Sequence, residues 1–531
     1  MPHDIDDAIR QLNAGRLEEA MAAARALASA PPADGRALAV WGVAALELGR
    51  HAEAIGPLKA AASQARDVAS YVGVMVPLAR ALQGAGLWAE AEKAVSAAER
   101  AGTQSPDDRD RLGGVLFRIG LHERALPHFR AAAQAVPDRA EFQRDLGMGL
   151  IALGRLDEAE AALERAISLD ADFGIAHMTL ADLRTWTPDT SHLDRLSALW
   201  GSQALPAGDR PAVGFALFKE LDDLGRRDEA WPVLEEANRL EAADQPPWSR
   251  DAERELVEAL IDAFPAERFR GLGRAAPISG PGPRPVFIVG LPRSGTTLVE
   301  RILAAHTGVV AMGELVAFPL LFKQASAAAG GELLDARTAR AGAGIDWPGL
   351  ARAYRAETAY LWRGGEHVID KQPRNSAYVG AIRLAFPDAL IIHLRRDPMD
   401  GLLGAYKVSF ASGHAWSRRL QDLADHYHLH RRLMAHWRAC LGEGLIELDY
   451  EALAADPEPQ IRRLLDACGL AFEEACLSPE RAAGSVATAS SAQVRSPISG
   501  KRIGAWKRYA TQLEPLRSRL QAQGDLEPGD V

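Results

Sequence analysis

The stretch RPVFIVGLPRSGTTLVERILAAH, residues 284–306, decides the fold of the C-terminal half of the chain. Its apolar run at residues 286–289 predicts a buried strand, and the run from Gly295 through Leu303 predicts a helix. Gly290 and Gly295 enclose a four-residue loop, so backbone N–H groups and the helix N-terminus converge where an anion can bind. The residues expected to contact that anion are Pro292, Arg293, Ser294, Gly295, Thr296 and Thr297.

The loop lacks the lysine of nucleotide triphosphatases. Thr296 stands where an ATPase or GTPase carries the lysine that reaches the β and γ phosphates. We therefore predict a site for a 5′-phosphate without a polyphosphate tail, and an NTP-dependent kinase or hydrolase is disfavoured. The structural alternative is a tight strand-to-helix turn without any ligand.

The rest of the C-terminal half alternates apolar and helical runs. VFIV, ALIIHL and LIEL read as buried strands with helices between them, which predicts a P-loop-like three-layer α/β domain with a central parallel sheet. The Gly- and Pro-rich residues 271–285 before it read as a linker or loop.

The first half repeats with a period near 34 residues. Five glycines, each followed five residues later by an alanine, mark the units: Gly15, Gly49, Gly86, Gly120 and Gly154, then Ala20, Ala54, Ala91, Ala125 and Ala159. A glycine that ends one helix in a left-handed conformation, and an alanine where the next helix crosses closely, explain the pattern. This period predicts a tetratricopeptide-repeat α-solenoid. Gly225 and Ala230 mark a further unit, and residues 185–192 between are irregular.

The expected domain order follows from these patterns. It is a solenoid at residues 1–175, degenerate or further helical repeats at 176–245, a helix and linker at 246–283, the α/β domain at 284–520, and an acidic tail at 521–531. Solenoid grooves bind proteins or peptides, and a structural or oligomerising role is an equal alternative. A homodimer is compatible with the sequence, which leaves the oligomeric state open.

Composition excludes several classes of function. The 531 residues carry 61 Lys and Arg against 71 Asp and Glu, a net charge of -10, so the chain is not a general nucleic-acid binder. The N-terminal MPHDIDDAIR is not a secretory signal, and no apolar run reaches membrane-spanning length. Three cysteines without metal-type spacing favour the cytoplasm. Richness in Ala, Arg and Leu suggests a GC-rich bacterial genome.

Five segments in order resemble one enzyme family: PRSGTT, VIDKQPRN (368–375), FPDALIIHLRRDPMD (386–400), IELDYEAL with DPEPQIRRLLDACGL (446–470), and TASSAQVRSPIS (488–499). They resemble sulfotransferases that use 3′-phosphoadenosine 5′-phosphosulfate (PAPS). With the repeats, the chain resembles bacterial tetratricopeptide-repeat sulfotransferases, which are similar to tyrosylprotein sulfotransferases. The resemblance implies PAPS as donor and no metal. It favours a protein or peptide tyrosine as acceptor, recruited by the solenoid, and leaves carbohydrate and small-molecule hydroxyls open.

The resemblance also assigns catalytic roles. Arg293 would contact the 5′-phosphosulfate, and Lys371 would stabilise the bridging oxygen of the donor. Glu314 would be the general base, and Leu315 would occupy that position if the local register shifted by one residue.

Further residues would hold the nucleotide. Arg396 would bind the 3′-phosphate, with Arg395 as the less favoured neighbour. Tyr450 and Ser490 or Ser491 match nucleotide-contacting positions. A packed tyrosine and a loop hydroxyl are equally good interpretations of these last residues.

Two positions depart from the family pattern. Gly404 stands where a serine is usual, although its backbone N–H could still donate. Ala505 stands where a basic residue usually precedes Trp506. Substitutes near Ala505 are Lys501, Arg502, Lys507 and Arg508. We expect weaker donor binding, and a nucleotide-binding scaffold with little or no activity is the alternative.

The histidines of DLADHYHLHRRLMAHWRA do not predict a metal site. His426, His428, His430 and His436 do not share one helical face, apart from His426 with His430. We expect an amphipathic helix that packs on the sheet.

Overall fold

The structure is a computed structural model that describes residues 4–29, 32–243, 245–272, 282–410, 413–482, 484–488, 491 and 493–526. It divides into two compact units. The first comprises Met1–Leu153 with Arg355–Leu361, and the second comprises Gly154–Tyr354 with Trp362–Val531. The division falls inside the run of repeats. Each unit is described by itself.

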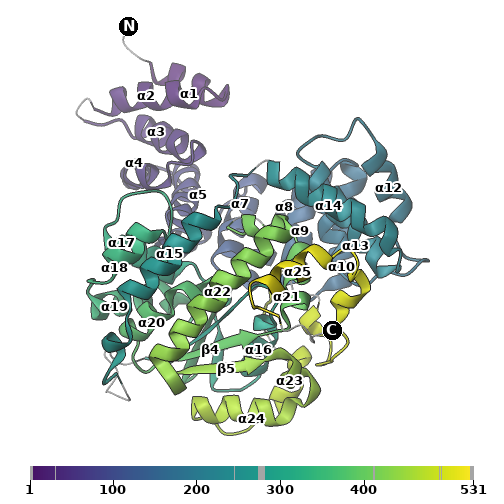
Figure 1. Ribbon diagram of the computed structural model, residues 1–531. Helices are drawn as coiled ribbons and strands as arrows, with labels where there is room; N and C mark the ends of the chain where they lie inside the picture. Colours follow the sequence, from purple (N-terminus) through teal and green to yellow (C-terminus); the bar gives the residue numbers. More distant parts are fainter. Residues whose placement is uncertain are drawn as a thin grey trace. The chain divides into compact units, whose positions relative to one another are not determined.

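Antiparallel helix pairs build the first unit (Figure 1). The helices are α1 (Ile5–Asn13), α2 (Leu17–Ala28), α3 (Gly35–Glu47), α4 (His51–Gln64), α5 (Val68–Gly84), α6 (Trp88–Ala101), α7 (Pro106–Arg118), α8 (His122–Ala135) and α9 (Ala140–Ala152). The repeat glycines have φ between +73° and +84°, and each repeat alanine is fully buried. Both physical reasons for the repeat pattern are therefore confirmed, as is the solenoid.

A segment from much later in the chain belongs to the first unit. Arg355–Leu361 spans the end of α19 (Trp347–Thr358) and the turn η2 (Ala359–Leu361). The Glu357 carboxylate accepts a hydrogen bond from the Ala89 N–H (2.8 Å) in the first turn of α6, a helix without a side-chain cap of its own. The Tyr360 hydroxyl donates to the Ile119 carbonyl oxygen (2.8 Å) at the end of α7.

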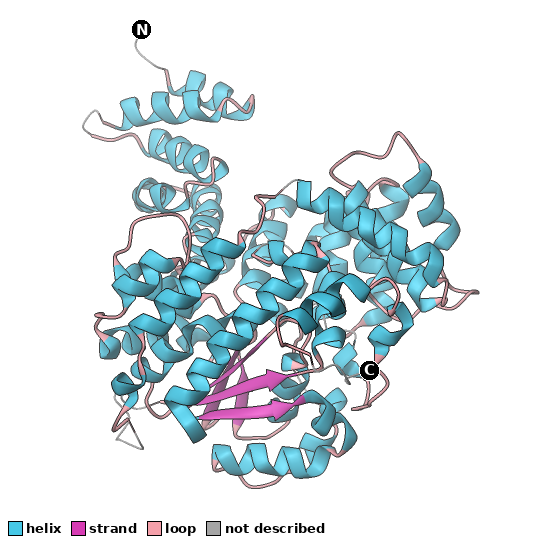
Figure 2. Cartoon of the chain, viewed as in Figure 1, coloured by secondary structure: helices cyan, strands magenta, loops and turns pink. Residues whose placement is uncertain are grey.

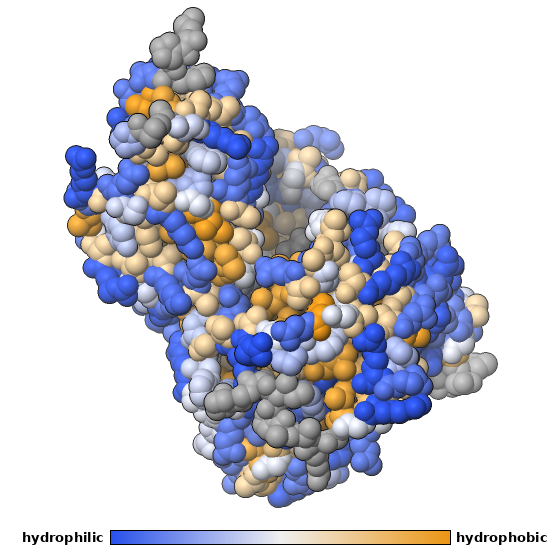
Figure 3. All heavy atoms as spheres, turned by 90° about the vertical axis from the view of Figure 1, so that its left-hand side faces the viewer, coloured by the Kyte–Doolittle hydropathy of each residue, from blue (hydrophilic) through white to orange (hydrophobic). Residues whose placement is uncertain are grey.

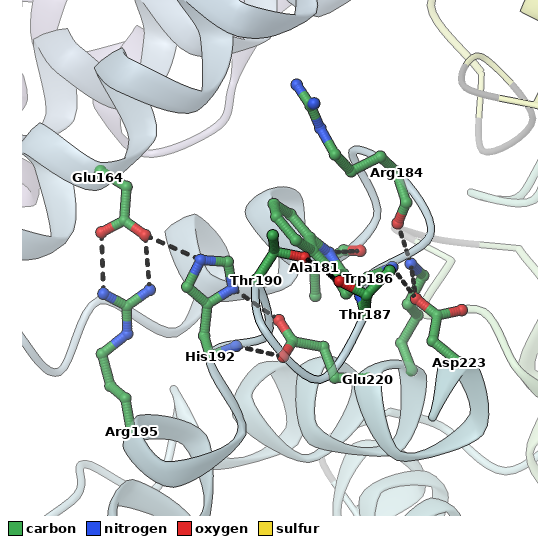
Figure 4. A network of polar contacts seen from close by, with 11 residues as sticks. Glu164, Ala181, Arg184, Trp186, Thr187, Thr190, His192, Arg195, Glu220 and Asp223 are labelled. Atoms are coloured by element: carbon green, nitrogen blue, oxygen red, sulfur yellow. Dashed lines mark hydrogen bonds and ion pairs between the residues drawn. The ribbon is translucent and has the colours of Figure 1, made fainter. Parts of the chain in front are cut away.

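The repeats continue into the second unit as α10 (Leu156–Leu169), α11 (Gly174–Ala181), α12 (Leu193–Gly201), α13 (Arg210–Asp223) and α14 (Arg227–Ala243). A loop joins α11 to α12 where the sequence is irregular, and polar contacts hold it (Figure 4). His192 binds Glu220 (Nδ1–Oε1, 2.8 Å) and Glu164 (Nε2–Oε1, 3.1 Å). The Trp186 N–H donates to Asp223 (2.9 Å), which also pairs with Lys219 (2.5 Å). The loop is thus fixed at both ends.

The central sheet of the second unit has five parallel strands in the order β2-β3-β1-β4-β5 (Figure 2). The strands are β1 (Arg284–Gly290), β2 (Val309–Ala311), β3 (His367–Lys371), β4 (Leu390–Arg395) and β5 (Leu445–Asp449). The predicted parallel α/β fold is confirmed. The chain leaves β1 toward β2 and β3 on one side and later crosses to β4 on the other, so β1 is the topological switch point, where such sheets bind ligands.

Helices cover both faces of the sheet. Val286 and Ile288 of β1 face the core made with α16 (Thr296–Ala304) and α24 (Pro457–Cys468). The intervening Phe287 points to the opposite face, where its ring contacts Phe318 of α17 (Ala317–Ser326) and Tyr354 of α19. The remaining helices are α15 (Arg250–Ala263), α18 (Ala336–Gly342), α20 (Val379–Ala385), α21 (Pro398–Tyr406), α22 (Leu420–Leu441), α23 (Tyr450–Ala455) and α25 (Glu514–Ala522).

The last repeat helices share one hydrophobic core with the α/β domain. Phe215, Leu221 and Leu234 from α13 and α14 belong to the same buried cluster as Leu402 of α21 and Leu516 of α25. Polar contacts reinforce this core. Asp222 of α13 accepts from the Lys407 ammonium (2.8 Å) and from the Tyr509 hydroxyl (2.7 Å) of the turn η9 (Ala505–Tyr509). These repeats are therefore built into the α/β domain.

On the molecular face drawn in Figure 3, exposed hydrophobic residues are interspersed with hydrophilic ones. Among the described residues, no helix combines the length and the apolar character that crossing a membrane requires.

Candidate functional site

The loop after β1, the candidate phosphate-binding loop, has a constrained backbone. Gly290 has φ +150°, and a Cβ atom there would lie 2.8 Å from the Leu394 carbonyl oxygen. Arg293 has φ +68°, an unfavourable left-handed conformation for a residue with a side chain. Such strain costs about 1–3 kcal/mol and is typical of ligand-binding segments. The loop leads directly into α16, whose first N–H groups have no partner inside the helix.

The hydroxyls of the loop are buried at the start of α16. Ser294, Thr296 and Thr297 are each no more than 5% exposed. Ser294 Oγ has no hydrogen-bond partner among the described residues. Thr297 Oγ1 lies 3.5 Å from Thr488 Oγ1, which brings the C-terminal segment beside the loop. Pro292 is half-buried in the turn closed by the Ser294 N–H and the Leu291 carbonyl (3.2 Å).

Tyr450 contacts both the loop and Arg396. A Cβ atom on Gly295 would lie 2.7 Å from Tyr450 Cδ2, so the ring covers this glycine. The Arg396 guanidinium lies 4.5 Å from the ring centroid, within cation–π distance. Tyr450 is only 8% exposed, and its ring therefore fixes the position of Arg396 relative to the loop.

Three arginines from different segments form a cationic cluster at the loop. Arg396 donates to the carbonyl oxygens of Arg293 (2.8 Å) and Arg502 (3.2 Å), and no carboxylate among the described residues pairs with it. Burial, reinforced by Arg502 and Arg396, lowers the pKa of Arg293 to about 10, and Asp182 opposes this effect. Burial likewise lowers the pKa of Arg502, with Arg396 contributing. The three guanidiniums together favour an anion.

Arg395 and Arg396 point to different surroundings. Arg395 makes a two-pronged ion pair with Asp449 (2.8 and 2.9 Å) at the end of β5. Asp397 and Asp400 do not pair with Arg396. Asp400 instead accepts from the N–H groups of Gly504 (2.6 Å) and Trp506 (2.9 Å), and thereby holds the C-terminal segment that carries Arg502.

The second cluster joins Glu314 to Lys371. Lys371, the last residue of β3, is fully buried, and its ammonium donates to the Glu314 carboxylate. The Glu314 side chain is 40% exposed, so its carboxylate faces both Lys371 and solvent. Leu315 is 2% exposed and points into the core. Of the two residues considered for the base, Glu314 is the one that the backbone presents.

Hydrogen bonds on both sides hold the turn that carries Glu314. The Met312 N–H donates to the Ile369 carbonyl (2.9 Å), and the Lys371 N–H donates to the Gly313 carbonyl (2.9 Å). The carboxylate of Glu314 is consequently supported by a rigid backbone.

The sequence-predicted residues thus converge at one edge of the sheet. The carboxyl ends of parallel strands meet at the same edge. The loop follows β1, Glu314 follows β2, Lys371 ends β3, Arg396 follows β4 and Tyr450 follows β5. The arrangement can bind an anionic nucleotide and place a carboxylate and an ammonium beside it.

At three positions the structure does not support the predicted contact with the nucleotide. Gly404 is the seventh residue of α21, so its N–H belongs to the helix's own hydrogen bonding and cannot make the predicted donation to a ligand. Ser491 donates its N–H to the Thr488 carbonyl (2.9 Å) and stabilises a turn. Ser490 lies outside the described residues.

A cavity of about 480 Å³ lies behind the loop, between β4, β5 and α22. It reaches the loop through Leu291 and Ser294 and is also lined by Arg396. Arg293, Glu314 and Lys371 do not line it, so the cavity does not include the Glu314–Lys371 pair.

Comparisons with known proteins agree with this geometry. Residues 285–474 match the model of the sulfotransferase family, and residues 118–183 match a tetratricopeptide-repeat model. The chain carries tetratricopeptide repeats and a sulfotransferase-family domain.

An uncharacterized protein of Aquifex aeolicus (strain VF5) is 31% identical to the chain over 413 residues, which cover 74% of the chain and 52% of that protein. The chain thus spans about half the length of this relative. Among solved structures, "MamA MSR-1 C2" is 21% identical with a TM-score of 0.27 and covers 31% of this chain and 94% of its own. The TPR protein TTC0263 of Thermus thermophilus is 22% identical with a TM-score of 0.28, covering 34% of this chain and 96% of its own.

Three charged residues near the site were not predicted from the sequence. Glu300 and Arg301 are both buried within the apolar helix α16, and two charges inside LVERIL were a usable signal. Asp182, at the end of α11, acts electrostatically on Arg293, more than 100 residues away. No local pattern could have indicated that pairing.

The four histidines of α22 have different polar partners, although the ring centroids of His426 and His430 lie 6.5 Å apart. His426 pairs with Glu253 (2.6 Å), His428 with Asp525 (3.0 Å), and His436 with the Phe264 carbonyl (2.9 Å). Burial lowers the pKa of His430. Among the described residues, no three His, Cys, Asp or Glu side chains gather as metal ligands.

Proposed function

We propose that the protein transfers a sulfuryl group from PAPS to an acceptor hydroxyl, and that the acceptor is a tyrosine of a protein or peptide. The observation that carries the proposal is the pairing of Glu314 with the buried Lys371 at the same sheet edge as the phosphate-binding loop. A phosphate loop alone would suit any nucleotide. A carboxylate and an ammonium together supply a base and a leaving-group cation, which group transfer requires.

The residues present fit the donor. The start of α16 and Arg293 would hold the 5′-phosphosulfate, and Arg396 with Arg502 would hold the 3′-phosphate. Arg502 thereby compensates for Ala505, and Arg396 Nε, buried without a partner among the described residues, is available for such a contact. Arginine suits forked contacts with phosphate oxygens. PAPS supplies an activated sulfuryl group on a phosphate leaving group.

The side chains would then divide the reaction between them. Glu314 accepts the proton of the acceptor hydroxyl, whose oxygen bonds to sulfur. The S–O bond to the phosphate breaks, its electron pair stays on the phosphate oxygen, and Lys371 donates a hydrogen bond to that oxygen. A positioned base contributes about 10²–10⁴ in rate. Since both charges come from side chains, no metal is needed for this chemistry.

The acceptor assignment rests on the sequence resemblance and on the repeats. Solenoid surfaces usually bind protein or peptide, and α11 to α14 share a core with the sulfotransferase domain. A polypeptide bound to these helices would therefore lie on the same rigid body as the transfer site. We also propose action in the cytoplasm, where the thiols of Cys440, Cys468 and Cys476, all free here, persist.

Nucleotide binding and transfer are tested separately. Adenosine 3′,5′-bisphosphate should raise the melting temperature by mass action, and ATP should do so much less. Arg396→Ala should abolish the shift. Arg395→Ala, which removes the neighbouring guanidinium paired with Asp449, is the matched control and should retain it.

Transfer is measured with sulfur-labelled PAPS and a cell extract separated into protein, glycan and small-molecule fractions. We expect label in protein tyrosine, and none with Glu314→Gln despite normal bisphosphate binding. Label in glycans alone would overturn the acceptor assignment. Nucleotide binding without any transfer would favour the scaffold alternative.

A further inference from the structure

Glu300 is a buried carboxylate beside the pair formed by Glu314 and Lys371. It lies on α16, the helix that starts at the phosphate-binding loop, and is 5% exposed. Its Oε2 atom is 3.8 Å from Lys371 Nζ, and its Oε1 atom has no hydrogen-bond partner among the described residues. Burying an ionised carboxylate is costly unless a cation and hydrogen bonds compensate. Its place therefore requires a functional explanation.

Lys371 lies between two carboxylates of different exposure. The Glu314 side chain is 40% exposed and that of Glu300 only 7%. The Gly313 N–H, in the turn that carries Glu314, lowers the pKa of Glu300 slightly. One buried carboxylate thus lies beside the lysine and acts electrostatically with the backbone that presents the proposed base.

We propose that Glu300 is a positioning residue that keeps the Lys371 ammonium charged and in place when Glu314 releases it. The inference rests on the proposed function. A base that shares its carboxylate with an ammonium is a poor proton acceptor, so Glu314 must separate from Lys371 during transfer. Lys371 would then be a buried cation without a partner if Glu314 were its only counter-charge. Glu300, buried beside Lys371, provides the second counter-charge.

Other charged groups near Lys371 are already engaged. Arg301, adjacent to Glu300, donates to the carbonyls of Pro479 and Ala482. Asp370, the neighbour of Lys371 on β3, accepts from the Tyr354 hydroxyl (2.8 Å) on the other face of the sheet. Burial raises the pKa of Glu300, and Lys371 counteracts that rise. Glu300 and Glu314 are therefore the carboxylates that compete for this ammonium.

The test compares Glu300→Gln with wild type by two readouts. The first is the ¹³Cε chemical shift of Lys371 across pH 7 to 11 in lysine-labelled protein, which is favourable because the chain has only eight lysines. We expect Lys371 to titrate at lower pH in the variant. The second is the pH profile of kcat, whose alkaline limb should move in the same direction. The loss in kcat should be about a hundredfold, with KM for PAPS changed less than about threefold.

Glu241→Gln is the matched control. Glu241 is likewise a carboxylate with a pKa raised by burial and one buried cationic partner, Arg418 at 2.8 Å, but it lies on α14 away from Lys371. It should leave both readouts unchanged. Glu300→Asp keeps the charge on a shorter side chain. Its Lys371 titration and its kcat should lie between those of wild type and Glu300→Gln. This variant replaces Glu300→Gln in the test if the latter does not fold.

The outcomes separate the two proposals. An unchanged Lys371 titration in both Glu300 variants would overturn the role of Glu300, whatever the activity. If Lys371 titrates at lower pH in Glu300→Gln but the wild-type protein transfers no sulfuryl group, the Glu300–Lys371 pairing would be supported and the proposed function overturned.

Discussion

Gly404 of α21 leaves the space in which the side chain of Arg293 begins. A Cβ atom on residue 404 would lie 3.1 Å from Arg293 Cβ and 3.6 Å from its Cγ. The departure from serine at this position is therefore coupled to the path of Arg293. The sequence suggests that Gly404 only removes a hydroxyl group. In the structure, the absence of a side chain at this position leaves space for Arg293.

We predict that Gly404→Ser weakens binding of adenosine 3′,5′-bisphosphate, because the added atoms displace Arg293. The expected loss is about 1 kcal/mol, or roughly fivefold in Kd, by calorimetric titration. Gly404→Ala should show the same loss. Gly401→Ala is the control, since a Cβ atom at this position of the same helix meets nothing within 4 Å. Tighter binding by the serine variant would contradict the steric argument.

Asp182 should lower the affinity of the protein for adenosine 3′,5′-bisphosphate. Its carboxylate acts electrostatically on Arg293, so an incoming phosphate competes with it. Because Asp182 is exposed and water screens its charge, we predict that Asp182→Asn tightens bisphosphate binding only about twofold, most clearly at low salt. Asp189→Asn removes the same charge from an exposed position of the same loop and should have little effect. Weaker binding in the Asp182 variant would instead mean that Asp182 orients Arg293.

His192 should stabilise the second unit in a pH-dependent way. Burial lowers its pKa, but hydrogen bonds to Glu164 and Glu220 outweigh burial and raise it from 6.5 to about 9. A raised folded-state pKa means stabilisation that is full below about pH 6.5 and lost as pH rises through about 9. We predict that His192→Gln costs about 2 kcal/mol at pH 6 and less at pH 10, by chemical denaturation. A loss of stability in His192→Gln that does not change with pH would refute this account. Ser191→Ala, at the neighbouring position, is the control and should show no such pH dependence.

Asp110 should destabilise the first unit at alkaline pH. Burial and the neighbouring Asp145 carboxylate raise its pKa from 3.8 to about 7. A carboxyl group with a raised pKa favours folding at low pH, and this advantage is lost as pH rises through about 7. We predict that Asp110→Asn stabilises the protein by about 1–2 kcal/mol at pH 8 and hardly at pH 4, measured by thermal unfolding. The control is Asp138→Asn, at an exposed position before α9, which should leave the stability unchanged at both pH 8 and pH 4. Equal stabilisation by Asp110→Asn at the two pH values would contradict the prediction.

Local patterns predicted the fold well. The loop between Gly290 and Gly295 and the repeat glycines carry their conformation in a few adjacent residues, so their spacing was informative. Strand β2, only Val309–Ala311, was not predicted, because three residues show no periodicity and its pairing with β3 supplies its stability. The domain boundaries drawn from the sequence remain a proposal.

Long-range pairings could not be predicted. The contact of Asp222 with Lys407 joins residues 185 positions apart, and the approach of Gly404 to Arg293 depends on how α21 packs against the loop. Spacing along the chain contains no information on such neighbours. The candidate site was thus predictable as a set of residues, but their partners, including Glu300 and Asp182, were not.

The core that α13 and α14 share with α21 determines where this architecture can be recombined. The repeats that precede α11, as far as the structure describes them, contribute no residue to that core. The helices α13 and α14 do, through Phe215 and Leu234, so their replacement would open the core of the α/β domain. A chimaera that grafts a different recognition module onto this domain should accordingly be joined before Gly174 and not at the glycine- and proline-rich stretch that the sequence offers as a natural cut.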